Sequence, residues 1–164
     1  MTGCVSCTPP EHEPGLVMTT GSWKILLHPD QTVPGALLAV AQRHVPKVSQ
    51  LTDAEAADFF GVYRLVERAL EGTLGATMVN LSCLRNWAFR ATDPDPPWAN
   101  GRPDPHVHWH VAPRFERPVT IGQESFVDVD FGNQLVWRGR QVDEVTRRLL
   151  IDALRPALAV TDGV

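Results

Sequence analysis

Apolar and polar residues alternate along Pro105–Pro113, a stretch that reads PHVHWHVAP. Three histidines alternate there with two β-branched residues and one aromatic residue: His106, His108 and His110 with Val107, Val111 and Trp109. This composition and this period of two are typical of a β-strand. Because successive side chains of a strand point to opposite faces, the pattern predicts that the three histidines share one face, with neighbours about 6.5–7 Å apart.

Other apolar runs predict the remaining elements. Three further strands are expected over Trp23–His28, Ala36–Ala41 and Ala76–Leu81. A T-x-x-E capping box at Thr52 predicts the start of a helix that ends near Gly72, with apolar residues at helical spacing: Phe59, Tyr63, Val66 and Leu70. A second helix is expected to begin at Asp143 and to lose its regularity at Pro156, with one apolar side: Val145, Leu149, Leu150, Ala153 and Leu154.

Ser82–Asp104 shows no clear period and holds two tryptophans and Phe89. Connections of this length are uncommon in compact domains and are often binding loops or lids, so a partly packed functional loop and a structureless insertion both remain open. Phe126–Gly132 is interpreted as a short segment that returns toward the core, and Val160–Val164 as a frayed tail.

Length and composition favour one globular domain over residues 1–164. The 43% hydrophobic and 21% charged content is ordinary, and no apolar run is long enough to cross a membrane. The first residues lack the basic and apolar regions of a signal peptide, so a cytoplasmic location is expected. A net charge of −4 argues against a general nucleic-acid binder. Three cysteines do not suggest a disulfide framework.

The histidine-rich strand permits three interpretations: a solvated face, a metal site, or catalysis by one imidazole that its neighbours support. Two other candidate groups are ambiguous in isolation. The CxxC formed by Cys4 and Cys7 is either half of a metal site or without function, with His12 as a nearby candidate ligand. His44, at a strand end, is by default a surface residue.

His106–Arg114 resembles the HxHxH motif of the histidine triad (HIT) superfamily of nucleotide hydrolases and transferases, and in particular its diadenosine tetraphosphate hydrolase-like members. The order of parts is also similar: Pro34-Gly35, an apolar strand ending at His44, a long helix, and Asn80 on the strand before the triad. The resemblance covers about residues 4–114, with a C-terminal, helix-bearing extension over 115–158. It implies an α+β fold with an antiparallel sheet of about five strands, one long helix and one C-terminal helix.

The resemblance also implies a ligand set and a partner. Zinc-containing members of the superfamily hold one structural zinc, and the matching positions here are Cys4, Cys7, His44 and His106. This would complete a Cys2His2 shell, which structural zinc favours, and leave Cys83 free. A homodimer is implied as well, with a nucleotide as substrate and no membrane or nucleic-acid polymer as partner.

The implied reaction is attack by the neutral imidazole of His108 on the α-phosphorus of a nucleotide ester, phosphoramidate or dinucleoside polyphosphate. His108 would then need a fixed hydrogen-bond acceptor, such as a backbone carbonyl, for its other nitrogen. His110 and Asn80 would bind the phosphate. Arg102 and Arg114 are candidates for offsetting phosphate charge, with solvated surface cations as the alternative.

The sequence departs from the superfamily pattern in three places. Residues 100–105, which read NGRPDP, stand where members usually carry a Gly-Gln or Gly-Ser phosphate clamp. His28 stands where many members have an acidic residue that holds the ribose, and Ala36 stands where many have a histidine. Two rival functions are kept: a zinc-dependent hydrolase with its metal on the triad, and a nucleotide-binding protein without catalysis.

Overall fold

The computed structural model describes residues 4–159; the expected tail at Val160–Val164 lies outside them. Its central feature is a five-stranded antiparallel sheet in the order β1-β2-β3-β5-β4. The strands are β1 Leu16–Thr19, β2 Trp23–Leu27, β3 Leu37–Ala41, β4 Met78–Ser82 and β5 His108–Arg114. The expected α+β architecture is therefore confirmed, while β1 was not predicted.

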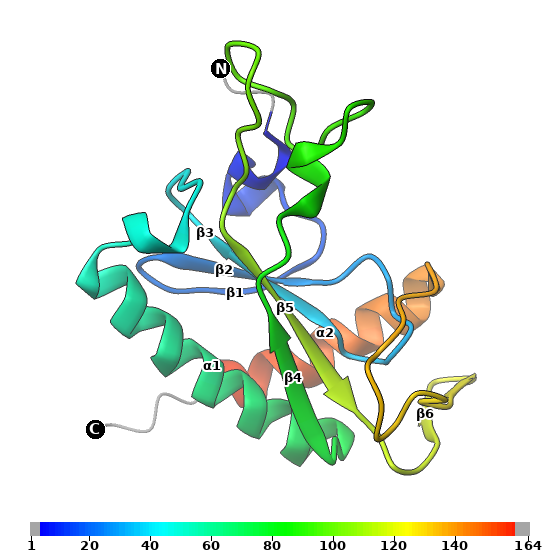
Figure 1. Cartoon of the computed structure of the whole chain (residues 1–164). Helices are drawn as coiled ribbons and strands as arrows, with labels where there is room; N and C mark the ends of the chain where they lie inside the picture. The colour runs from blue at the N-terminus through cyan, green and yellow to red at the C-terminus, as the bar shows by residue number, and fades with distance from the viewer. Residues whose placement is uncertain (1–3, 160–164) are drawn as a thin grey trace.

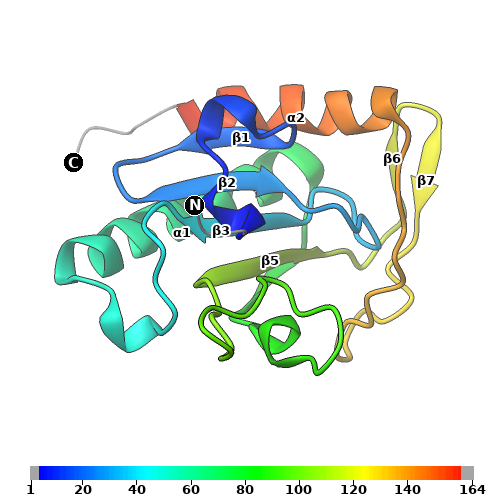
Figure 2. The same cartoon turned by 90° about the horizontal axis from the view of Figure 1, so that it is seen from above.

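The two α-helices lie side by side (Figures 1 and 2), α1 over Asp53–Leu74 and α2 over Glu144–Ala159. The capping box predicted at Thr52 is present in full, since Thr52 accepts from the Glu55 amide and the Glu55 side chain accepts from the Thr52 amide. The helix was predicted to end near Gly72, and it ends two residues later. The helix continues to Leu74 and stops at Gly75, which has a left-handed φ of 72° that glycine adopts without a steric penalty.

The C-terminal helix also corrects two expectations. Pro156 lies inside α2 and does not end it. The carbonyl that loses its partner belongs to the exposed Asp152, where water can hydrate it. The predicted apolar side is confirmed at Leu150 and Leu154, but Val145 and Leu149 are exposed. The other buried side chains are Thr146, Ile151 and Leu158, so the apolar side is rotated from the predicted one.

The remaining elements are short. A hairpin of β6 Val119–Ile121 and β7 Glu124–Phe126 forms a separate two-stranded sheet. Within the described part of the chain, four 3-10 helices complete the order: η1 Val5–Cys7, η2 Pro10–His12, η3 Val48–Gln50 and η4 Asn86–Phe89. No helix among residues 4–159 has the length and apolar character needed to cross a membrane.

Core packing distinguishes the two faces of the first part of β5 and the residue before it. Val107 and Val111 are buried in the core with residues of both α-helices, and Trp109 packs against the same cluster. The alternating side chains of His108 and His110 therefore face away from the helices, as the sequence predicts. Figure 1 shows the N-terminal segment (blue) and the loop over residues 82–104 (green) on the side away from α1 and α2.

Candidate functional site

Four side chains from three distant parts of the chain converge beside the start of β5. Cys4 precedes η1 and Cys7 ends it, His44 follows β3, and His106 lies two residues before β5. One ligand atom from each of the four lies within 4.8 Å of the others. The structure thus brings together all four residues that the sequence identified as a metal-binding set.

The spacing of these atoms fits a tetrahedral zinc ion. The Nδ1 atom of His106 lies 3.5 Å from Cys4 Sγ and 3.6 Å from Cys7 Sγ, and His44 Nδ1 lies 3.3 Å from Cys7 Sγ. Zinc–sulfur bonds of ~2.3 Å and zinc–nitrogen bonds of ~2.0 Å at tetrahedral angles place neighbouring ligands roughly 3.3–3.8 Å apart. These three distances match tetrahedral zinc, and all four ligand atoms lie within 4.8 Å of one another, so the residue types and their spacing fit this ion.

In both imidazoles the Nε2 atom lies close to a protein oxygen, and the Nδ1 atom is left free to bind a metal. His106 Nε2 donates to the Ala41 carbonyl at 2.7 Å, so its lone pair is on Nδ1, which faces the thiols. His44 Nε2 lies 3.1 Å from Asp104 Oδ1. A carbonyl or carboxylate behind a histidine is the usual second contact of a metal ligand.

Protonation behaviour at this cluster is consistent with cation binding. Burial, with smaller contributions from His44, His108 and Lys24, lowers the pKa of His106 to about 4, so its imidazole is neutral. Burial, and then the neighbouring Cys7, raises the pKa of Cys4 to about 11. A bound divalent cation opposes this rise, because it stabilises the thiolates as ligands.

Lys24 anchors the segment that carries the two cysteines. Its side chain is only 2% exposed. Its Nζ donates to the carbonyls of Ser6 and Thr8 at 3.1 and 2.6 Å, and to Glu13 Oε1 at 2.8 Å. Because Ser6 lies between the cysteines, this buried ammonium fixes the loop that positions both thiols.

Lys24→Met should loosen this loop and weaken metal retention. Methionine keeps most of the volume but leaves two carbonyls and the Glu13 carboxylate without their donor, at a cost of about 3 kcal/mol in the free energy of unfolding. Urea denaturation and zinc competition with a chromophoric chelator measure the two effects. The control Lys47→Met alters an exposed lysine and should change neither the free energy of unfolding nor the zinc affinity. Equal stability and equal zinc affinity in the two variants would contradict this role of Lys24.

The backbone of His106 sets the tautomer of His108. His108 Nδ1 lies 2.8 Å from the His106 carbonyl oxygen, which can only accept, so Nδ1 carries the proton and Nε2 carries the lone pair. This confirms the predicted contact with a backbone carbonyl. Burial lowers the pKa of His108, an effect that Asp95 opposes and Arg85 reinforces. The neutral imidazole therefore presents a nucleophilic Nε2.

His110 and His28 lie beside His108 on the same side of the sheet. The rings of His108 and His110 are in an edge-on contact at 5.1 Å between centroids. His28 Nε2 lies 3.1 Å from His110 Nδ1. Burial, with contributions from His108 and His28, lowers the pKa of His110 to about 4, and a hydrogen bond to the Leu84 backbone opposes this shift. The structure thus brings His28 to the triad, in direct contact with an imidazole.

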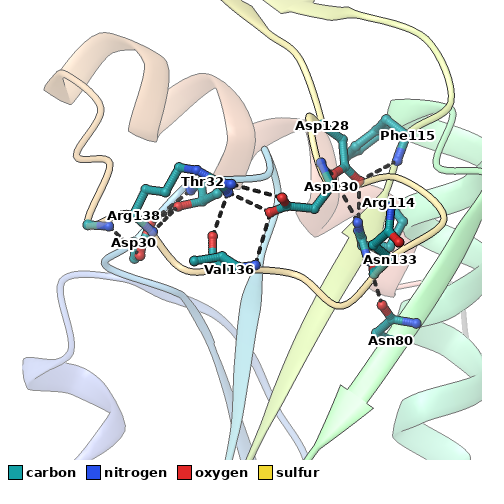
Figure 3. A network of polar contacts seen from close by, with 11 residues as sticks. Asp30, Thr32, Asn80, Arg114, Phe115, Asp128, Asp130, Asn133, Val136 and Arg138 are labelled. Carbon is teal, nitrogen blue, oxygen red and sulfur yellow. Dashed lines mark hydrogen bonds and ion pairs between the residues drawn. The ribbon is translucent and has the colours of Figure 1, made fainter.

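The other predicted phosphate-binding residues have different surroundings. Asn80 Oδ1 accepts from Arg114 Nη1 at 3.0 Å (Figure 3). Arg114 is neither a solvated cation nor open to phosphate, because it is 2% exposed and makes two hydrogen bonds of 2.6 and 3.0 Å to Asp128. Both sequence interpretations of Arg114 are therefore wrong. Arg102 is exposed in the 82–104 loop, where its backbone pairs with Ala99.

Several residues near the triad were not identified from the sequence. Ser82 pairs with His110 in the β4–β5 register, and Arg85 and Asp95 influence the pKa of His108 from the 82–104 loop. Trp137 stacks on His28 with 4.5 Å between ring centroids. Trp137 lies in a stretch with no motif, so no local sequence signal could have identified it.

Comparisons with known proteins agree with this geometry. No protein-family model matches the sequence. The chain is 33% identical over 82 residues to the asymmetrical bis(5'-nucleosyl)-tetraphosphatase of Schizosaccharomyces pombe. The match covers 50% of this chain but only 39% of that relative. The chain therefore spans about two fifths of the curated protein that it matches.

Two solved structures share the fold along nearly the whole chain. A hypothetical histidine triad nucleotide-binding protein from Sulfolobus tokodaii superposes with a TM-score of 0.66 at 16% identity, covering 94% of this chain and 91% of its own. A zinc-bound histidine triad family protein from Mycobacterium smegmatis gives 0.59 at 21% identity, covering 95% and 93%. The chain has the fold of the histidine triad proteins, and the resemblance inferred from the sequence is confirmed.

Proposed function

We propose that this protein is a nucleotide hydrolase or nucleotidyl transferase that acts at the α-phosphate of a nucleotide ester, phosphoramidate or dinucleoside polyphosphate. The reaction proceeds through a covalent nucleotidyl-histidine intermediate on His108. One structural zinc per chain, held by Cys4, Cys7, His44 and His106, supports the site. The nucleotide hydrolase in Schizosaccharomyces pombe is a sequence relative that supports this assignment.

One observation carries the proposal: His108 is a half-buried, neutral imidazole whose tautomer is fixed. Its Nδ1–H is held by the His106 carbonyl at 2.8 Å, so the lone pair on Nε2 is available for attack. Burial lowers its pKa and keeps it unprotonated. A nucleophile needs both conditions, a free lone pair and a defined orientation.

The chemistry follows in two displacements. In the first, His108 Nε2 forms a bond to the α-phosphorus while the bond to the leaving-group oxygen or nitrogen breaks, and that atom takes the electron pair. In the second, water attacks the same phosphorus, the phosphorus–nitrogen bond breaks and His108 is regenerated. Another acceptor in place of water makes the protein a transferase. His110 donates to a phosphoryl oxygen and offsets its charge, and Asn80 contributes its amide beside Arg114.

The zinc-hydrolase alternative fits the geometry less well. It needs several triad imidazoles on one open metal ion. Within residues 4–159, the cluster that can hold a metal joins His106 to two cysteines and His44. His108 Nδ1 is instead bonded to a carbonyl and His110 Nδ1 contacts His28, which favours nucleophilic over metal-assisted hydrolysis.

Hydrolysis in oxygen-18 water tests the proposed position of attack. Adenylyl phosphoramidates and dinucleoside polyphosphates should release a nucleoside monophosphate that carries the label, because water attacks the α-phosphorus. Mass spectrometry of both products locates the oxygen. Label in the polyphosphate product would contradict attack at the α-phosphorus, and tight binding of these compounds without turnover would support the binding protein.

A further inference from the structure

His28, the residue after β2, has both ring nitrogens engaged. Its Nε2 lies 3.1 Å from His110 Nδ1. The Asp30 amide donates to His28 Nδ1 at 2.9 Å, and the Asp30 carbonyl oxygen lies 3.0 Å from the same nitrogen. The imidazole is thus held between the backbone of its own loop and the last histidine of the triad.

The Asp30 amide decides where the protons lie. Two Asp30 groups contact His28 Nδ1: the carbonyl oxygen at 3.0 Å, which would suit a protonated Nδ1, and the amide at 2.9 Å, which needs a lone pair there. Because the amide hydrogen is fixed by the backbone and a proton on Nδ1 would clash with it, we assign the lone pair to Nδ1. In a neutral imidazole the other nitrogen then carries the proton. His28 Nε2–H therefore donates to His110 Nδ1, and the proton of His110 is on its own Nε2.

The loop that holds His28 is itself bonded to a distant segment, residues 136–140. The Asp30 carboxylate accepts from the amides of Gly139 at 2.7 Å and Arg140 at 3.0 Å. The Gln31 amide donates to the Arg140 carbonyl at 2.7 Å, and Thr32 Oγ1 accepts from the amide of residue 138 at 2.8 Å. These contacts join two parts of the chain that are more than 100 residues apart in sequence.

The 136–140 segment has its own internal brace and covers one face of His28. Arg138 makes two hydrogen bonds to Asp130, of 2.6 and 2.8 Å, and a third to the Val136 carbonyl (Figure 3). The ring of Trp137, the residue between Val136 and Arg138, stacks on the ring of His28. The interplanar angle is 14° and the ring centroids lie 4.5 Å apart. Stacking of this kind fixes the plane of the imidazole, and with it the direction of Nε2–H.

We propose that His28 and the 136–140 segment form a positioning device that holds His110 in its Nε2–H tautomer, so that His110 presents a neutral N–H donor to an anionic substrate oxygen. His28 is then a positioning residue that acts through His110. The effect of His28 on turnover rests on the function proposed above, whereas the tautomer of His110 is independent of that function.

Nitrogen-15 NMR of the full-length, zinc-loaded protein tests the tautomer directly. Long-range proton–nitrogen correlations distinguish a protonated ring nitrogen from one that carries a lone pair. In the wild-type protein we expect His110 to be protonated at Nε2 and His28 to be protonated at Nε2. A His110 protonated at Nδ1 would overturn the proposal. No substrate is used, so this result does not depend on whether the protein turns over any nucleotide.

A pair of variants at His28 separates positioning from folding. His28→Leu removes the donor, and the His110 signals should then show a mixture of both tautomers. His28→Gln places an amide N–H at about the reach of Nε2 and should preserve the wild-type pattern. An unchanged His110 tautomer in folded His28→Leu would overturn the proposal. If His28→Leu does not fold, His28→Gln and the wild-type spectrum still decide it.

The kinetic consequence is read with the substrate that the oxygen-18 experiment identifies. His28→Leu should lower kcat about tenfold, the effect of losing one well-placed hydrogen bond, with KM changed less than about twofold. His28→Gln should recover most of kcat. Equal losses in both variants, or a change confined to KM, would overturn the positioning role. Absence of turnover in the wild-type protein would overturn the proposed function and leave the NMR result standing.

Discussion

His108→Ala should abolish turnover while leaving the fold and the zinc content unchanged. The substitution removes the nucleophile and therefore the pathway, so we expect kcat/KM to fall by on the order of 10⁴-fold or more. The side chain lies on the sheet face away from the helices and is not among the four proposed zinc ligands. Steady-state kinetics, circular dichroism and elemental analysis measure the three properties.

Matched substitutions make this result specific. His12→Ala removes an exposed histidine and should leave kcat/KM unchanged. His110→Ala should slow turnover and still permit an intermediate on His108. Near-normal activity in His108→Ala, or a loss of zinc in the same variant, would contradict the assignment of His108 as the nucleophile.

The Cys4→Ser, Cys7→Ser double variant should lose its zinc and much of its stability together. Metal binding to such a site is coupled to folding. At free zinc about 1,000-fold above its Kd, the lost binding corresponds to about 4 kcal/mol in the free energy of unfolding. Elemental analysis and urea denaturation measure zinc content and stability in the same preparations.

Zinc loss should also reduce kcat in whatever fraction stays folded. His106 Nδ1 faces the thiols, its Nε2 bonds the Ala41 carbonyl, and its own carbonyl orients His108. Freeing the His106 ring should therefore loosen the carbonyl that orients His108, the proposed nucleophile. Cys83→Ser, at the cysteine outside the cluster, is the control and should keep stoichiometric zinc. Full zinc retention in the double variant would exclude this site.

The site was predictable where the sequence pattern is local. Alternation along Pro105–Pro113 shows the histidine face because a strand has a period of two. The capping box at Thr52 uses residues three apart, so its contacts were determined by local sequence. The zinc set is not local, and residue chemistry alone left the CxxC and His44 open. The resemblance to a known ligand pattern joined them.

The features of the fold and site that the sequence did not predict depend on contacts between distant residues that carry no motif. Arg114 looked like a surface cation, but Asp128 lies 14 residues later and pairs with it in a buried position. Asp30 bonds Gly139 across 109 residues, and this contact brings Trp137 to His28. The β1 strand of four residues is too short for a clear period. In each case tertiary packing decided the outcome.

Rapid quench with a nucleotide substrate labelled with phosphorus-32 at the α-phosphate tests the central claim most directly. An acid-labile label should accumulate on the protein within the first turnover, and peptide mapping should locate it on His108. The label should be absent from His108→Ala and present in His12→Ala. Label on His106 or His110, or turnover with no protein-bound label at any time, would contradict the covalent mechanism.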